Sequence, residues 1–275
     1  MVFSCKTSQP YSRNENSALK DAFTYPLKEK LVSIHRGGGF NEGYPENCVE
    51  SFIYYHKQMP TALIECDVRL SADSVLFLLH DDSLQRTTDF WGKAADFTMS
   101  YLGKSKLKDH MGHSTDFSIP TLEAALTNLP SDQIFTLDVK RGTPYSLVMN
   151  KVNELGKRDQ CIIITYSATE ALTVYSHDSR FKISATIKSL ADYQRLKDFG
   201  LEDKNLVAFI GTVEPDKSLI DFLHQKGILC ILGTIGNLDK MAEKRNNLPY
   251  LDWSKAGADV FATDRPLQAY RILNE

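Results

Sequence analysis

The sequence lacks both a long apolar run and an excess of positive charge. No apolar stretch approaches the ~20 residues that a membrane-spanning helix needs, so no transmembrane segment is predicted. With 32 lysines and arginines against 35 aspartates and glutamates, the formal net charge is −3. Proteins that hold nucleic acid by bulk positive potential carry the opposite balance, so we expect no nucleic-acid partner.

Cysteine is also scarce, and its spacing excludes the common cysteine motifs. All cysteines but Cys5 lie in apolar surroundings, where a cysteine behaves as a small buried residue. The sequence therefore predicts buried free thiols rather than a disulfide framework. The five cysteines, an odd number without Cys-x-x-Cys spacing, are Cys5, Cys48, Cys66, Cys161 and Cys230.

Cys5 stands in a different context from the other cysteines. Val2, Phe3 and Ser4 precede it and a polar stretch follows, which resembles the end of a bacterial lipoprotein signal. The apolar segment that normally precedes such a cysteine is not part of this sequence, which starts at Met1. Two alternatives follow: a periplasmic or lipid-anchored protein with a truncated signal, or a cytoplasmic protein with an irregular N-terminus.

Short apolar runs alternate with amphipathic segments over most of the 275 residues. Residues 1–30 are polar and are expected to form a leader or tether, while 31–275 are expected to form a single domain. Alternation of strand and helix patterns predicts a mostly parallel sheet. The candidate strands are 31–34, 62–68, 75–80, 134–139, 161–166, 182–187, 206–211, 228–233 and 260–263. The helical patterns include 48–58, 121–129, 145–156, 168–176, 190–199 and 217–226.

These strand candidates number one more than a (β/α)₈ barrel contains. The run 75–80 is the surplus one, because only six residues separate it from the strand before, and a parallel crossover needs a dozen or more. It is expected to form a hairpin-like arm inside the second βα loop, which ends near Pro120. The predicted fold is therefore a TIM (β/α)₈ barrel with a hairpin-like insertion, and ~250 residues is a typical length for that fold.

Two carboxylates, Glu65 and Asp67, interrupt an otherwise apolar strand. Residues two apart on a strand point to the same face, so both side chains share one environment. Burying two like charges side by side is costly unless a cation neutralises them. The next apolar run ends at His80. Two carboxylates and a histidine on consecutive strands predict an active site rather than a hydrophobic core.

A similar arrangement recurs at the ends of other strands. His35 and Arg36 follow the first strand, while Asp138 and Lys140, again two apart, end the third barrel strand. Catalytic groups of TIM barrels lie at the C-terminal ends of the strands and in the loops that follow. We therefore expect acids, imidazoles and cations from four segments to meet at one end of the barrel.

These residues lie in motifs that follow one another along the chain from about residue 32 to 268. The motifs are His35-Arg36-Gly37, Pro45-Glu46-Asn47, Glu65-x-Asp67, His80-Asp81, Leu84-Gln85-Arg86-Thr87-Thr88 with Gly92, Ile119-Pro120-Thr121-Leu122-Glu123, Asp138-Val139-Lys140 and Thr263-Asp264-Arg265-Pro266. In these motifs and in their order, the chain resembles bacterial-type glycerophosphodiester phosphodiesterases. The resemblance implies a TIM barrel that hydrolyses small-molecule glycerophosphodiesters to glycerol 3-phosphate and an alcohol, with a divalent cation.

The resemblance also implies roles for the charged residues. Glu65, Asp67 and Asp138 are the implied ligands of one cation, and their hard oxygen donors suit Mg²⁺ or Ca²⁺. Arg36 is expected to grip the substrate's phosphate in a bidentate fork, and Lys140 to add a point charge. The family more often has glutamate at the Asp138 position. The shorter side chain would draw the cation closer or leave room for a water ligand.

His35 and His80 are the candidate acid–base pair, because imidazoles titrate near neutrality. The resemblance implies that one takes a proton from the substrate's glycerol hydroxyl, which attacks phosphorus to form a cyclic intermediate. The other histidine then protonates the leaving alkoxide. The residues leave both assignments open, and we favour His35 as base and His80 as acid. Asn47 keeps two interpretations, N-cap of the following helix or site residue.

The seventh barrel strand departs from the family pattern. Family members often carry a tryptophan at its end, where the ring lines the glycerol site, but this chain has Gly233 there. We expect either a wider pocket or one filled by another aromatic ring, such as that of Tyr166. The preferred alcohol group therefore stays open.

Two other functions remain as alternatives. A phospholipase-D-like phosphodiesterase acting on larger lipid diesters would share the barrel and the two-histidine chemistry. A catalytically inactive binding barrel would normally have lost a paired histidine or a ligand, and this chain has kept all of them. The sequence carries no signal for an oligomeric state.

Overall fold

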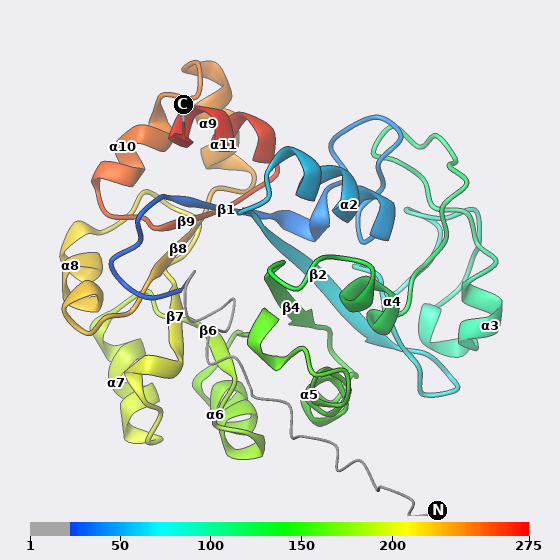
Figure 1. Cartoon of the computed structure of the whole chain (residues 1–275), viewed down its shortest axis with the longest axis horizontal. Coiled ribbons are helices and arrows are strands. Elements are labelled where there is room, and N and C mark those ends of the chain that lie inside the picture. Colours follow the sequence, from blue (N-terminus) through cyan, green and yellow to red (C-terminus); the bar gives the residue numbers. More distant parts are fainter. Residues whose placement is uncertain (1–22, 275) are drawn as a thin grey trace, which may run out of the picture.

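Eight parallel strands close into a barrel surrounded by helices in the computed structural model, which describes residues 23–274 (Figure 1). β1 pairs in parallel with both β2 and β9, which closes the sheet. The predicted TIM barrel is confirmed. Its strands are β1 (Leu31–Ile34), β2 (Leu63–Leu70), β4 (Phe135–Val139), β5 (Cys161–Thr165), β6 (Lys182–Thr186), β7 (Leu206–Phe209), β8 (Cys230–Gly233) and β9 (Val260–Thr263).

The surplus strand forms the predicted hairpin arm. β3 (Leu76–Leu78) pairs antiparallel with the last residues of β2. It begins a long connection, residues 71–121, which separates β2 from the next barrel helix. Buried residues of this connection, among them Phe77, Leu84 and Leu102, form an apolar cluster of their own. The connection is therefore an ordered part of the fold.

Both strands of the arm end at positions that differ from the expected ones. β2 runs past Asp67 to Leu70, because it pairs with β4 as far as Val68 and with β3 at its end. Asp67 therefore lies inside the strand, one residue before its last pairing with β4. β3 ends at Leu78, so His80 follows the strand instead of ending it.

The helical patterns found in the sequence all form helices, within a few residues at their ends. A capping box, for example, begins α6, where Ser167 and Glu170 each accept a hydrogen bond from the other's backbone N–H. The six predicted helices are α2 (Val49–Gln58), α4 (Leu122–Thr127), α5 (Tyr145–Glu154), α6 (Ala168–His177), α7 (Leu190–Asp198) and α8 (Lys217–Gln225). Further helices are α3 (Met99–Leu102), α9 (Asn237–Lys244), α10 (Pro249–Lys255) and α11 (Pro266–Asn274), with 3₁₀ turns η1 (His35–Gly37), η2 (Ala94–Asp96), η3 (Arg158–Gln160) and η4 (Asp203–Asn205).

Two apolar layers hold the barrel together. The larger one lies between the strands and the outer helices and contains Phe52, Phe135 and Phe181. A smaller cluster joins residues near the starts of the strands, such as Leu63, with Phe23 from the expected leader. Because Phe23 is only 3% exposed, the described part of that leader packs against this end of the barrel. The domain division at residue 30 stays a prediction.

The four described cysteines, Cys48, Cys66, Cys161 and Cys230, are buried and free, as predicted. Cys5, on which the alternatives for localisation depend, lies outside the described residues. Within the described part of the chain, no helix is long and apolar enough to cross a membrane.

Candidate active site

Three buried carboxylates meet at the C-terminal ends of two neighbouring strands. Glu65 and Asp67 lie on β2 and Asp138 lies on β4, where Asp67 and Asp138 are partners in the parallel register. One oxygen of each carboxylate lies within 4.8 Å of the other two. The three residues are at most 8% exposed. The pairing of β2 with β4 thus places the three predicted ligands around one point.

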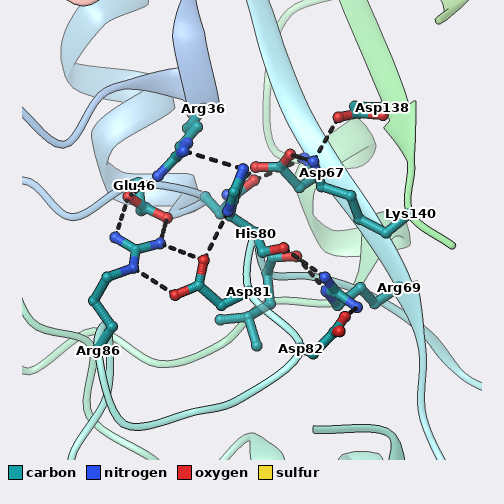
Figure 2. Close-up of polar contacts among 12 residues, drawn as sticks. Arg36, Glu46, Asp67, Arg69, His80, Asp81, Asp82, Arg86, Asp138 and Lys140 are labelled. Carbon is teal, nitrogen blue, oxygen red and sulfur yellow. Dashed lines mark hydrogen bonds and ion pairs between the residues drawn. The ribbon is translucent and has the colours of Figure 1, made fainter. Parts of the chain in front are cut away.

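Lys140 supplies a positive charge to this acidic cluster of Glu65, Asp67 and Asp138. Its Nζ lies 2.6 Å from Asp67 Oδ1 and 2.5 Å from Asp138 Oδ2 (Figure 2). Although burial opposes it, the Lys140 ammonium holds the pKa of Asp67 below its usual value. For Glu65, burial and then the charges of Asp67 and Asp138 raise the pKa well above its usual value. One ammonium therefore does not balance the negative charge of the cluster.

The donor atoms of the cluster fit a hard divalent cation. Asp138 Oδ1 is buried and has no hydrogen-bond partner among the described residues. Its other carboxylate oxygen accepts hydrogen bonds from Lys140 and from the Tyr166 hydroxyl, the latter at 2.8 Å. A buried carboxylate oxygen without a donor is costly, and a bound cation removes that cost. An all-oxygen donor set is the one that Mg²⁺ and Ca²⁺ prefer.

Asn47 holds Asp67 and does not cap a helix. α2 begins at Val49 with Cys48 as its N-cap residue, and Cys48 makes no side-chain capping bond. Asn47 is 1% exposed and has a positive φ of 53°, a conformation that asparagine tolerates. Its Nδ2 donates to Asp67 Oδ2 at 2.7 Å, and its Oδ1 accepts from the Asp67 backbone N–H at 2.9 Å. The N-cap interpretation is therefore wrong, because this backbone turn directs the amide toward β2.

Replacing Asn47 by alanine is expected to destabilise the protein by about 2 kcal/mol, because Asp67 stays buried with two hydrogen bonds fewer. Cation affinity should fall about 10- to 100-fold, since the ligand loses its orientation. Denaturant unfolding and calorimetric titration measure the two effects. Asn41→Ala is the matched control: it removes one 3.5 Å contact with Tyr54 and should change stability by less than about 0.5 kcal/mol. Equal effects of the two substitutions would argue against a special role for Asn47.

Each predicted catalytic histidine pairs with an aspartate through Nδ1. His35 Nδ1 lies 2.6 Å from Asp264 Oδ1, and His80 Nδ1 lies 2.7 Å from Asp81 Oδ1. A carboxylate in this position fixes the ring and leaves Nε2 for proton transfer. The backbone N–H of Asp264 donates to the buried Asp239 at 2.8 Å, which fixes it in turn. Sequence reasoning assigned no role to either aspartate, although Asp81 stands next to its histidine.

Arg36 connects the acidic cluster with His80. It lies in the 3₁₀ turn η1 after β1 and has a φ of 55°. Its backbone N–H donates to Glu65 Oε2 at 2.6 Å. Its guanidinium donates to His80 Nε2 at 3.0 Å (Figure 2). The turn requires Gly37, because a Cβ at that position would lie 1.9 Å from the Phe52 ring.

A cavity at this end of the barrel adjoins both the acidic cluster and one histidine. His35, Glu65 and Asp138 lie on its wall, so the predicted base shares the cavity with two predicted ligands. Each of the seven predicted site residues thus contacts another of them or lines this cavity with them. Their catalytic and binding roles stay predictions. The remaining lining residues are Ser33, Thr136, Ile164, Thr165, Tyr166, Ser184, Thr186, Phe209, Ile231, Ile235 and Ala262.

The space over Gly233 is filled by Phe209 from β7. A Cβ at position 233 would lie 2.9 Å from Cζ of the Phe209 ring and 2.9 Å from Cγ2 of Thr212. Tyr166, the ring suggested for this space, lies on the same cavity but donates its hydroxyl to Asp138. An aromatic wall is therefore present, and it comes from the neighbouring strand.

Comparisons with known proteins agree with this fold. Residues 35–267 match the glycerophosphoryl diester phosphodiesterase family. A glycerophosphoryl diester phosphodiesterase from Parabacteroides distasonis has a similar crystal structure, with a TM-score of 0.85 and 31% identity over 91% of this chain and 88% of that one. An Oleispira antarctica phosphodiesterase, in complex with the product sn-glycerol-3-phosphate, has the same fold, with a TM-score of 0.70 and 18% identity over 90% of this chain and 98% of that one.

Among curated relatives, the glycerophosphodiester phosphodiesterase of Bacillus altitudinis is 31% identical over 111 residues, or 40% of this chain and 45% of that relative. The match spans less than half the length of such relatives. Fold and site together define a TIM-barrel protein with an acidic, histidine-containing centre. The chain belongs to the glycerophosphoryl diester phosphodiesterase family, since the family match covers most of its length.

Proposed function

We propose that this protein hydrolyses glycerophosphodiesters to glycerol 3-phosphate and an alcohol, using a bound Mg²⁺ or Ca²⁺. The observation that carries the proposal is the buried three-carboxylate cluster beside two aspartate-paired histidines. Membership of the family supports the reaction class. The product found on the Oleispira antarctica phosphodiesterase, sn-glycerol-3-phosphate, is the one proposed here.

Positive groups around the phosphate are the first requirement of this chemistry, because the transition state gathers charge on the phosphoryl oxygens. Arg36 would grip two of these oxygens with its planar fork, and Lys140 would add a point charge. Glu65, Asp67 and Asp138 would hold the cation, which when bound acts as a Lewis acid toward the phosphoryl group. Lys140 already contacts two of these carboxylates, so it lies next to the proposed cation.

His35 is the proposed base and His80 the proposed acid. His35 lies on the wall of the barrel cavity, where the glycerol part of the substrate would bind, so its Nε2 can take the proton of the attacking glycerol hydroxyl. That oxygen bonds to phosphorus as the ester bond to the alcohol breaks, giving a cyclic phosphate. His80, from the connection after β3, would protonate the leaving alkoxide. Water then opens the cyclic ester with the two roles reversed.

Hydrolysis of glycerophosphocholine and related diesters, followed as glycerol 3-phosphate release, tests this function. We expect release with Mg²⁺ or Ca²⁺ and none with EDTA, because the acidic cluster would lose its cation. Lysophosphatidylcholine is the discriminating substrate: cleavage of it alone would favour a phospholipase-D-like activity on larger lipids. Failure to release glycerol 3-phosphate from any head group, with either metal, would reject the proposal.

A further inference from the structure

Five charged or titratable side chains form a closed ring of contacts beside the acidic cluster (Figure 2). Arg36 contacts His80 Nε2 at 3.0 Å, and His80 Nδ1 contacts Asp81 Oδ1 at 2.7 Å. Arg86 Nε donates to Asp81 Oδ2 at 2.5 Å, and its Nη2 donates to Glu46 Oε1 at 2.8 Å. Glu46 Oε2 closes the ring by accepting from Arg36 Nη1 at 3.0 Å. Glu46 and Arg86 take no direct part in the proposed reaction.

Arg86 is the member that joins the two halves of this ring. Its guanidinium makes two hydrogen bonds to Asp81 and two to Glu46, all between 2.5 and 3.0 Å. A planar fork with fixed donors suits this geometry, whereas a lysine would offer a single ammonium. The hydrogen bonds from Arg86 hold the pKa of Asp81 well below its usual value. Asp81 therefore stays charged and remains a hydrogen-bond acceptor.

The ring selects one protonation form of His80. Asp81 can only accept, so the proton of the imidazole lies on Nδ1. Arg36 can only donate, so Nε2 carries the lone pair. Both conditions are met by the neutral Nδ1–H tautomer alone, which is the form of the substrate-free site. To act as the proposed acid, His80 takes up a proton on Nε2 after Arg36 has turned to the phosphate. The same ring holds the Arg36 guanidinium, the candidate phosphate ligand, through Glu46. Orientation of both groups thus depends on carboxylates that Arg86 holds.

We propose that Arg86 is a positioning residue of this site, which sets the ring orientation and tautomer of His80 through Asp81 and the orientation of Arg36 through Glu46. This inference rests on the proposed function only where it predicts kinetics. Arg86 itself acts through these neighbours, and its side chain is 45% exposed.

The local backbone is held by other groups, so an effect of Arg86 on His80 is not simply loss of structure. Arg69 donates to the backbone carbonyls of Leu79 and His80 at 2.9 and 2.6 Å. The loop that carries Arg86 is closed by backbone hydrogen bonds, among them Leu84 N–H to Gly92 at 3.0 Å. It is also anchored by Leu84, which is fully buried.

The test compares Arg86→Gln and Arg86→Lys with the wild type. In the cation-free protein, ¹⁵N NMR of the imidazole nitrogens reports the His80 tautomer, and we expect Arg86→Gln to convert one dominant Nδ1–H form into a mixture. The kcat should fall about 10- to 100-fold and KM should rise, because both His80 and Arg36 lose their support. Arg86→Lys, which keeps the charge but not the fork, should lie between the two.

Arg180→Gln is the matched control, since Arg180 forms the same kind of fork with Asp178 before β6, at the opposite end of the barrel. It should leave the His80 spectrum, kcat and KM unchanged. A wild-type tautomer in both Arg86 variants would overturn the proposal. So would a kcat loss that Arg86→Lys shares in full and that follows the melting temperature. The tautomer measurement needs no substrate, so it gives an answer even if the proposed hydrolysis is not found.

Discussion

Replacing His80 by alanine is expected to lower kcat by about 10²- to 10⁴-fold, the usual contribution of a general acid or base. Substrate binding should persist, because Arg36 and Lys140, the proposed phosphate ligands, are both still present. Loss of the imidazole removes the contact of Arg36 with Nε2, but the contact with Glu46 still orients the guanidinium. Steady-state kinetics and calorimetric titration with a slowly hydrolysed diester measure the two quantities. The expected signature is a large loss of kcat with a nearly unchanged binding constant.

His177→Ala is the control for this prediction. His177 is the last residue of α6, and its side chain forms a hydrogen bond with Asn150. It is therefore a hydrogen-bonded histidine that lies outside the candidate active site. Its removal should leave kcat within about twofold of the wild type, as expected for a surface substitution. Wild-type turnover in His80→Ala would remove His80 from the mechanism. Addition of imidazole that restores part of the lost rate would strengthen the assignment.

Glu65→Gln is expected to abolish cation binding and activity while leaving the cation-free protein at least as stable as the wild type. Burial and the neighbouring carboxylates raise the pKa of Glu65, which means that its charged form costs free energy in the folded protein. A neutral amide removes this cost and keeps an oxygen for the Arg36 backbone N–H. The wild type should instead gain about 2.7 kcal/mol from a cation at 100 times its dissociation constant.

Thermal unfolding with and without Mg²⁺ or Ca²⁺ measures this difference directly. The wild type should melt at a higher temperature with the cation, and Glu65→Gln should not respond. Glu202→Gln, a substitution on the surface, should behave as the wild type in both conditions. A cation-dependent shift that survives in Glu65→Gln would place the cation elsewhere. A large loss of cation-free stability would mean that the carboxylate serves the fold.

Much of the fold could be predicted because strands and helices depend on local patterns. The apolar runs around Glu65 and Asp138 mark strands whatever the rest of the chain does, and residues two apart share a face. The short link before β3 also excludes a parallel crossover. Less could be predicted where an element's limits depend on its neighbours. β2 extends to Leu70 only because β3 folds back onto it.

The partners of the site residues could not be predicted in the same way. His35 and Asp264 are 229 positions apart, and Arg86 and Glu46 are 40 apart. Neither distance carries a periodic signal, since such contacts depend on how several loops lie over one end of the barrel. Asn47 is instructive, because its position before a helix predicts a cap, whereas its positive φ turns it to Asp67.

By itself, the sequence determined the barrel and the types of residue that gather at its C-terminal end. Alternating apolar runs specify the strands. Carboxylates such as Glu65 and histidines such as His80 would be costly to bury in a hydrophobic core, so they indicate a site. Only the tertiary structure decided which groups meet. It paired each histidine with an aspartate, set Phe209 over Gly233 and brought Arg86 to the ring around His80. The physical reason is the distance along the chain over which each feature is set. A strand pattern depends on a few neighbouring residues, whereas hydrogen bonds between loops form only once the closed barrel has brought those loops together.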